Sequence, residues 1–253
     1  MYAEERQHKI LTLARSEGGV EVVRLASELG VAPETVRRDL RVLEQHGLIR
    51  RTHGGAYPVE TATFETTLAT RTTRWVPQKR RIAAAAAGLV GDAATIFVDE
   101  GFTPQLIAEA LPTDRPLTVM TASLTTAAQL AESDSITVLV LGGRVRGRTL
   151  ATVDHWATHM LAGFVIDLAF IGANGISREY GLTTPDPAVA EVKAQAIRAS
   201  RRRVFAGIHT KFGVGSFCRF AEIGQFEALV TDVGLSVTEA HRLSLLGPQV
   251  IRT

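Results

Sequence analysis

The chain has 253 residues, of which 45% are hydrophobic and 21% charged, and its formal net charge is +2 at pH 7. This composition excludes a disordered chain and supplies a buried core for one large domain or two modest ones. The nearly neutral charge does not by itself indicate a nucleic-acid partner. The single cysteine, Cys218, excludes an intrachain disulfide and a thiolate zinc cluster. Neither a secretory signal nor an apolar run near the roughly 20 residues of a membrane span is found, so we expect a cytoplasmic protein without metal or cofactor.

The N-terminal part of the chain predicts three helices. The first covers Glu4 to Ser16, and Gly18-Gly19 ends it. Residues 25–47 then predict two short helices joined by a tight turn, because Gly30 ends one and Pro33 favours the first turn of the next. One face of the last helix is apolar, with Val36, Leu40 and Leu43, whereas the opposite face carries Thr35, Arg37, Arg38 and Arg41.

This pattern is typical of a helix-turn-helix, whose second helix presents such side chains to the DNA major groove. An ordinary amphipathic hairpin with solvated arginines is the alternative. The residues that follow favour DNA binding, because residues 48–56 predict a basic β-hairpin wing that contains Arg50, Arg51 and His53. Five arginines stand against three acids between Glu34 and Arg51. We therefore predict a winged helix-turn-helix over residues 1–57 that binds double-stranded operator DNA.

The remaining sequence predicts a linker over residues 58–77, with one short ordered segment around Phe64–Leu68, and an α/β domain over 78–253. Apolar, β-rich runs alternate there with helical stretches, which indicates a mostly parallel sheet covered on both faces. The expected strands are Thr95–Val98, Leu117–Met120, Thr137–Leu141, Leu168–Ile171, Arg203–Ala206, Leu229–Thr231 and Gln249–Ile251. The expected helices are Lys79–Val90, Pro104–Ala110, Leu124–Ala131, Ala188–Ser200 and Thr238–Leu246.

Small and polar residues follow five of these strands. In open α/β sheets, ligands bind at the carboxyl ends of the strands, where backbone N–H groups and helix N-termini favour an anion. The pattern therefore indicates a site for a small phosphorylated ligand. The alternative is purely structural, since Thr103 and Ser123 also stand where helix N-caps are expected, and glycines serve tight turns whatever binds.

Several motifs of this chain resemble the DeoR family of bacterial repressors. They are ETVRRDL followed by EQHGLIRRTHGGA, and in the second domain Asp-x-Gly-x-Thr, Thr-x-Ser, DLAFIGANGI, GLTTPD and His-Thr-Lys-Phe-Gly. The resemblance covers nearly the whole chain. It implies a sensor domain with the fold of sugar-phosphate isomerases, which controls DNA binding by a phosphorylated sugar. The effector-binding residues that it implies are Asp99, Gly101, Thr103, Thr121, Ser123, Gly142, Gly143, Asn174, Lys193 and Lys211.

The chain departs from the family pattern at several positions. Ala32 replaces a Ser or Thr that would cap the second helix of the helix-turn-helix. In the sensor domain, polar groups of the family are replaced by Phe102, Pro104, Ala122, Val189 and Ile208. Such losses remove partners that a polyhydroxylated ligand would use, so we expect an unusual effector or weak binding.

The leading interpretation is a transcription factor, most readily a repressor, that works as a dimer or tetramer because paired half-sites supply specificity. Two alternatives remain. The first is a sugar-phosphate isomerase with an accessory DNA-binding domain, in which Asp99, Glu100, His209 and Lys211 supply acid–base groups, although no nucleophile–base pair is identifiable. The second is a DNA-binding protein whose sensor domain no longer binds a ligand.

Overall fold

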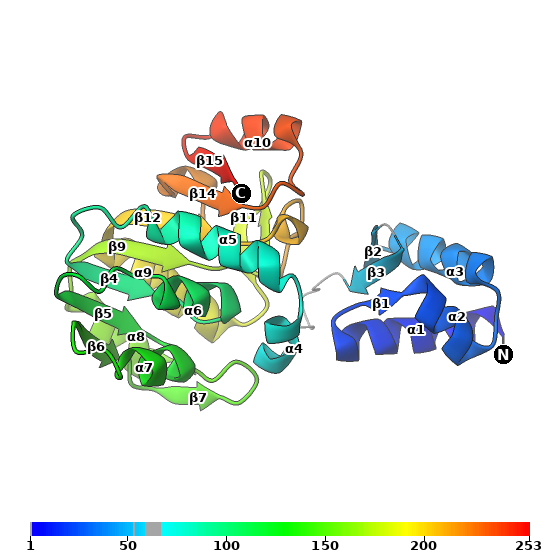
Figure 1. Ribbon diagram of the computed structural model, residues 1–253, viewed down its shortest axis with the longest axis horizontal. Coiled ribbons are helices and arrows are strands. Elements are labelled where there is room, and N and C mark those ends of the chain that lie inside the picture. The colour runs from blue at the N-terminus through cyan, green and yellow to red at the C-terminus, as the bar shows by residue number, and fades with distance from the viewer. Residues whose placement is uncertain (1, 53, 59–66) are drawn as a thin grey trace. The chain divides into compact units, whose positions relative to one another are not determined.

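The structure, a computed structural model, describes residues 2–52, 54–58 and 67–253 (Figure 1). The chain divides into two compact units, Met1–Arg74 and Trp75–Thr253. None of the helices in the described parts of the chain combines the length and apolar character that a bilayer crossing requires.

The first unit contains helices and a small antiparallel sheet. The helices are α1 (Ala3–Glu17), α2 (Val22–Leu29), α3 (Pro33–Gln45) and α4 (Leu68–Thr73). The strands β1 (Val20–Glu21), β2 (Ile49–Thr52) and β3 (Gly55–Pro58) form a sheet in the order β1-β3-β2. Ile10, Leu25, Val36 and Leu40 are almost fully buried in its core. The helix-turn-helix and the wing are therefore confirmed.

Two details of this unit differ from the sequence prediction. Residues 20–21, for which the sequence analysis predicts no strand, pair with the wing strand β3, so the wing belongs to a three-stranded sheet. The ordered segment predicted around Phe64–Leu68 overlaps only the first residue of α4, Thr67 precedes the helix, and residues 64–66 lie outside the described residues.

The second unit, residues 75–253, is described throughout and contains a seven-stranded sheet in the order β15-β14-β12-β9-β4-β5-β6. All of its pairs are parallel. Its strands are β4 (Thr95–Val98), β5 (Leu117–Thr121), β6 (Ile136–Val140), β9 (Ile166–Ile171), β12 (Ser200–Ala206), β14 (Ala228–Thr231) and β15 (Gln249–Arg252). Every predicted strand is present, which confirms the parallel α/β sheet.

Helices cover both faces of this sheet (Figure 1). They are α5 (Val76–Ala87), α6 (Phe102–Glu109), α7 (Leu124–Leu130), α8 (His155–Ala162), α9 (Pro187–Ala199) and α10 (Val237–Ser244). Successive strand residues point to opposite faces. Thus Val98 belongs to the same core cluster as Ile82 of α5 and Ile107 of α6, whereas Phe97 belongs to the cluster that contains Ala157 of α8 and residues of α9.

The sequence prediction missed several small elements. These are an antiparallel hairpin of β7 (Arg144–Arg146) and β8 (Ala151–Val153), the helix α8, and a sheet of β10 (Gly175–Ser177), β11 (Gly181–Thr184) and β13 (Cys218–Ala221). Two short 3-10 helices, η1 (His209–Lys211) and η2 (Ile223–Gln225), were also missed.

Helix α5 begins at Val76, inside the segment predicted as linker, and ends at Ala87 rather than Val90. Pro77 was interpreted as the end of the linker, but it lies in the first turn of the helix, where proline is favoured.

Candidate DNA-binding surface and effector site

The candidate DNA-binding surface is the exposed face of α3. At about 100° per residue, Glu34, Arg37, Arg38 and Arg41 share one side of this helix, opposite Val36 and the other buried positions. The structure thus brings the three predicted arginines together. Thr35 lies at the edge of this face and is half-buried.

Two features fix the position of α3. Gly30 ends α2 in the left-handed region, with φ of 64°, which turns the chain toward α3. Asp39, on the inner side of α3, is buried and accepts hydrogen bonds from Arg6 Nε at 2.5 Å and Gln7 Nε2 at 3.1 Å, both on α1. The predicted loss of a cap is confirmed, because Ala32 occupies the N-cap and no side chain accepts a hydrogen bond there.

The wing places its basic residues differently from one another. Arg51 is bound to α3, since its Nε donates to Glu44 Oε2 at 2.6 Å. Arg50 instead interacts with Tyr57. Burial raises the pKa of Tyr57, and the charge of Arg50 partly opposes that rise. Gly54 sits at the hairpin turn with φ of 97°. His53 lies outside the described residues.

Except for Lys193, which lies in α9, the predicted effector residues lie at or just after the carboxyl ends of β4, β5, β6, β9 and β12. Because neighbouring strands of the sheet are parallel, these ends lie along one edge. At its centre, Asp99 and Lys193 form a buried ion pair, with side chains 1% and 2% exposed. Asp99 also accepts a hydrogen bond from Gly172 N at 2.8 Å, and Lys193 Nζ lies 3.7 Å from Glu100 Oε1.

Three of the predicted hydroxyl and amide groups are engaged within the fold. Thr121 Oγ1 accepts from Ser123 N at 3.0 Å, and Ser123 Oγ accepts from Thr126 N at 3.2 Å. Asn174 is buried, and its Oδ1 accepts from Thr184 Oγ1 at 3.0 Å. The N-cap role expected for Ser123 is therefore confirmed. For Thr103 it is wrong, because Gly101 is the N-cap of α6, with φ of 111°, and Thr103 lies inside the helix.

The glycine turn after β6 is built for close packing. A Cβ atom on Gly143 would lie 2.2 Å from the Val153 carbonyl oxygen, and the φ of Gly143 is 137°. The N–H of Gly142 donates to Met160 Sδ at 3.2 Å. Lys211 lies in η1 and is half-buried.

Four of the family departures, Pro104, Ala122, Val189 and Ile208, are buried, and the last three belong to the apolar core. The fifth, Phe102, lies beneath the ammonium group of Lys79, a residue that the sequence analysis placed at the start of a helix but gave no role. Lys79 of α5 is buried, and its Nζ lies 5.3 Å from the centroid of the Phe102 ring. The signal that could have located it is its helical spacing from the apolar residues of α5.

The sequence prediction also missed a cluster at the end of β14. Asp232 accepts hydrogen bonds from His209 N at 2.7 Å and from the ring Nδ1–H of His209 at 2.6 Å. The His209 ring packs edge-on against Trp75, with centroids 5.2 Å apart. Burial opposes ionisation of Asp232, but these hydrogen bonds and the His209 charge hold its pKa below the usual value.

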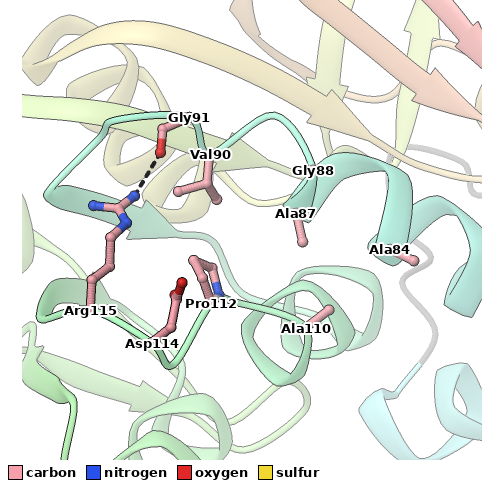
Figure 2. A pocket seen from close by; sticks show the side chains of 9 residues that line it. All are labelled: Ala84, Ala87, Gly88, Val90, Gly91, Ala110, Pro112, Asp114 and Arg115. Atoms are coloured by element: carbon pink, nitrogen blue, oxygen red, sulfur yellow. Dashed lines mark hydrogen bonds between the residues drawn. The ribbon is translucent and has the colours of Figure 1, made fainter.

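A surface groove of about 450 Å³ lies at the opposite edge of the sheet, between the ends of α5 and α6 (Figure 2). Ala84, Ala87 and Ala110 line it, and Arg115 crosses beside it to donate to the carbonyl oxygens of Gly91 and Ala93 at 2.8 and 2.9 Å. None of the predicted effector residues lines this groove.

Comparison with known proteins identifies the family of both units. The chain matches the model of the DeoR-like helix-turn-helix domain over residues 6–62 and that of the DeoR C-terminal sensor domain over residues 75–233. It is 33% identical over 251 residues to the HTH-type transcriptional regulator GlpR of Haloferax volcanii, covering 99% of this chain and 98% of that one. It is 28% identical over 232 residues to the glycerol-3-phosphate regulon repressor of Escherichia coli, covering 92% of each chain. Among solved structures, the sorbitol operon regulator SorC of Klebsiella pneumoniae is 11% identical with a TM-score of 0.42, covering 97% of this chain and 99% of that one.

Proposed function

Since the chain belongs to the DeoR family of transcriptional regulators, we propose that it represses genes of carbohydrate metabolism and responds to a phosphorylated sugar or polyol. The relative from Escherichia coli is named a glycerol-3-phosphate regulon repressor, which makes glycerol 3-phosphate the first compound to test. The observation that carries the proposal is the pair of sites in one chain: an exposed arginine face on α3 and a row of polar strand ends in the sensor unit.

We propose that Thr35, Arg37, Arg38 and Arg41 face the major groove and that Arg50, Arg51 and His53 of the wing contact the backbone. Arg38 supports this assignment best, because it is exposed and forms no ion pair with any residue that the structure describes. An arginine that reads guanine contributes about 1–3 kcal/mol of discrimination.

The test measures operator affinity of Arg37→Ala and Arg38→Ala, with Arg201→Ala as the matched control. Arg201 is 71% exposed on the sensor unit. We expect each α3 variant to bind the operator about tenfold or more weakly, which corresponds to at least about 1.4 kcal/mol. Unchanged affinity in both α3 variants would remove α3 from the interface.

For the effector, we propose that the phosphate binds near Lys211, after β12, and that the hydroxyl groups face Asp99, Thr121 and Asn174, with the Gly142-Gly143 turn after β6 at the far end of the site. Charge-assisted hydrogen bonds are about twice as strong as neutral ones, so phosphate recognition survives the loss of polar groups elsewhere. At the Gly142-Gly143 turn, the Met160 sulfur on Gly142 N–H is a weak acceptor that a hydroxyl oxygen of the ligand can replace.

Thermal unfolding of the full chain with glycerol 3-phosphate, fructose 1-phosphate, ribose 5-phosphate and inorganic phosphate tests this site. A ligand at 100 times its Kd stabilises the protein by about 2.7 kcal/mol. We expect modest stabilisation by several of the sugar phosphates, lost in Lys211→Ala. The absence of any shift would favour the alternative in which the sensor unit no longer binds a ligand.

We further propose that the chain performs no turnover, as its relatives are transcriptional regulators. Incubation with ribose and fructose phosphates at high protein concentration should leave them unconverted. Isomerisation that disappears in Lys211→Ala would instead support the enzyme alternative.

We also propose a dimer or tetramer, because one helix-turn-helix reads too few base pairs. Light scattering of the purified chain would show a monomer if this proposal is wrong.

A further inference from the structure

The exposed face of α3 has a carboxylate at its centre. Glu34, at the second position of the helix, is 62% exposed, and each of its oxygens holds one arginine. Oε2 accepts from Arg37 Nη1 at 3.1 Å, and Oε1 accepts from Arg41 Nη2 at 2.7 Å. Glu34 therefore forms ion pairs with two of the three arginines of this face.

The other carboxylates of α3 have different partners. Asp39 is buried against Arg6, and Glu44 binds Arg51 of the wing, where the hydrogen bonds from Arg51 lower the pKa of Glu44. Glu34 is thus the carboxylate of α3 that stands among the DNA-facing arginines. DNA carries one negative charge per about 1.7 Å of its axis, so a carboxylate at this position repels the phosphate backbone of any DNA sequence.

We propose that Glu34 is a specificity-determining residue, which restrains Arg37 and Arg41 from non-specific phosphate contacts. This inference rests on the proposed DNA-binding role of α3. On non-specific duplex the two guanidinium groups stay on the carboxylate, and Arg38 remains the available cation of the face. On the operator, base edges in the major groove replace the carboxylate as partners, because guanine offers two acceptors to one arginine. The carboxylate thus weakens binding to all DNA, and more strongly where no base contact compensates.

The position of Glu34 also suits a second role, as an anion in the first turn favours the helix N-terminus. That role is local and independent of DNA sequence. It predicts a change in stability of α3 but no change in the ratio of specific to non-specific affinity, so the two roles are separable by experiment.

The experiment compares Glu34→Gln with the wild-type full chain. Glutamine keeps the length and shape of the side chain and removes its charge. The probes are a random pool of duplexes of about 30 base pairs, long enough for two half-sites, and the sequence enriched from that pool by repeated selection on the wild-type chain. Affinity for each is measured over a series of salt concentrations.

We expect Glu34→Gln to bind the random pool more tightly, with a salt dependence steeper by about one to two units of log–log slope, since each new phosphate contact adds about 0.9. Affinity for the selected sequence should rise less, so the ratio of specific to non-specific affinity falls. Glu239→Gln is the matched control, because Glu239 forms the same kind of i,i+3 pair with Arg242 at 3.5 Å in the first turn of α10 in the sensor unit.

An unchanged slope on random duplexes, or an unchanged affinity ratio, would overturn the proposal. Arg38→Ala measured in parallel separates this failure from that of the proposed interface. If Arg38→Ala binds the selected sequence as the wild type does, α3 is not the DNA-contacting helix. If it binds more weakly while Glu34→Gln matches the wild type, the interface stands and Glu34 only serves the helix terminus.

Discussion

Removal of the Lys193 ammonium distinguishes a structural lysine from a ligand-binding one. In the structure Lys193 is 2% exposed and pairs with Asp99, and Glu100 Oε1 lies 3.7 Å away. The change Lys193→Met keeps most of the side-chain volume but leaves these two carboxylates buried without their shared cation. Breaking a buried ion pair by deletion of one partner costs about 3–5 kcal/mol, because the charge that remains is neither solvated nor compensated.

For a unit of this size, 1 kcal/mol shifts the unfolding temperature by about 2–4 °C, so the expected loss is roughly 6–20 °C. Calorimetry of the full chain measures it. The double variant Asp99→Asn/Lys193→Met should lose less than the sum of the single variants, since Asn retains an oxygen for Gly172 N–H and removes one of the stranded charges. Lys211→Met, at a half-buried lysine, is the control and should unfold near the wild-type temperature. A loss below about 1 kcal/mol in Lys193→Met would refute the argument from burial.

Two further predictions concern ionisation and helix capping. Because the pKa of Asp232 is lowered in the folded state, its contribution to folding stability is present above the unfolded pKa of about 3.9 and is lost as the pH falls through the folded pKa. Denaturation at several pH values should show that Asp232→Asn is less stable than the wild type near neutrality and that this stability difference closes in acid. A stability difference that does not change with pH would contradict the prediction. Ala32→Ser should supply the missing N-cap of α3 and slow amide hydrogen exchange in that helix by an amount equivalent to about 1 kcal/mol. Exchange at the wild-type rate would mean that the serine does not adopt the capping rotamer.

The parallel sheet was predictable because buried parallel strands form short, continuous apolar runs. Strand starts were predicted less well, as β9 shows. It begins at Ile166, two residues before the predicted start, because Asp167 continues the strand. Its carboxylate accepts from Thr95 N and Thr95 Oγ1 at 3.0 and 2.8 Å, and these hydrogen bonds are the main reason that its pKa is lowered. A strand partner 72 residues away leaves no local pattern in the sequence.

Helix α8 escaped prediction for the opposite reason, because its apolar residues are not confined to the buried face. Trp156 is 70% exposed and Met160 is 37% exposed, while Ala157 and Leu161 are buried. The periodicity that marks an amphipathic helix is therefore blurred. The hairpin of β7 and β8 is short and largely exposed in β7, which again gives no alternation.

Except for Lys193, which lies inside α9, the candidate effector residues lie at or just after strand ends that share an edge, so the sequence could indicate a site there. Their individual roles were not predictable. Lys193 was predicted as a ligand contact from family resemblance alone, but its partner Asp99 lies 94 residues earlier and neutralises it. Met160, which covers Gly142, comes from a helix that was not predicted.

The formal charges at the strand ends determine how a phosphorylated effector would orient. Asp99, Glu100 and Lys193 together carry one net negative charge, in a place that excludes water, and this disfavours a phosphate beside Lys193. Carboxylates are instead good acceptors for sugar hydroxyl groups. The phosphate would then turn toward Lys211, after the strand β12, which pairs with β9. On this argument a compound with a phosphate at one end and few hydroxyl groups at the other fits the proposed site better than a sugar phosphorylated at both ends.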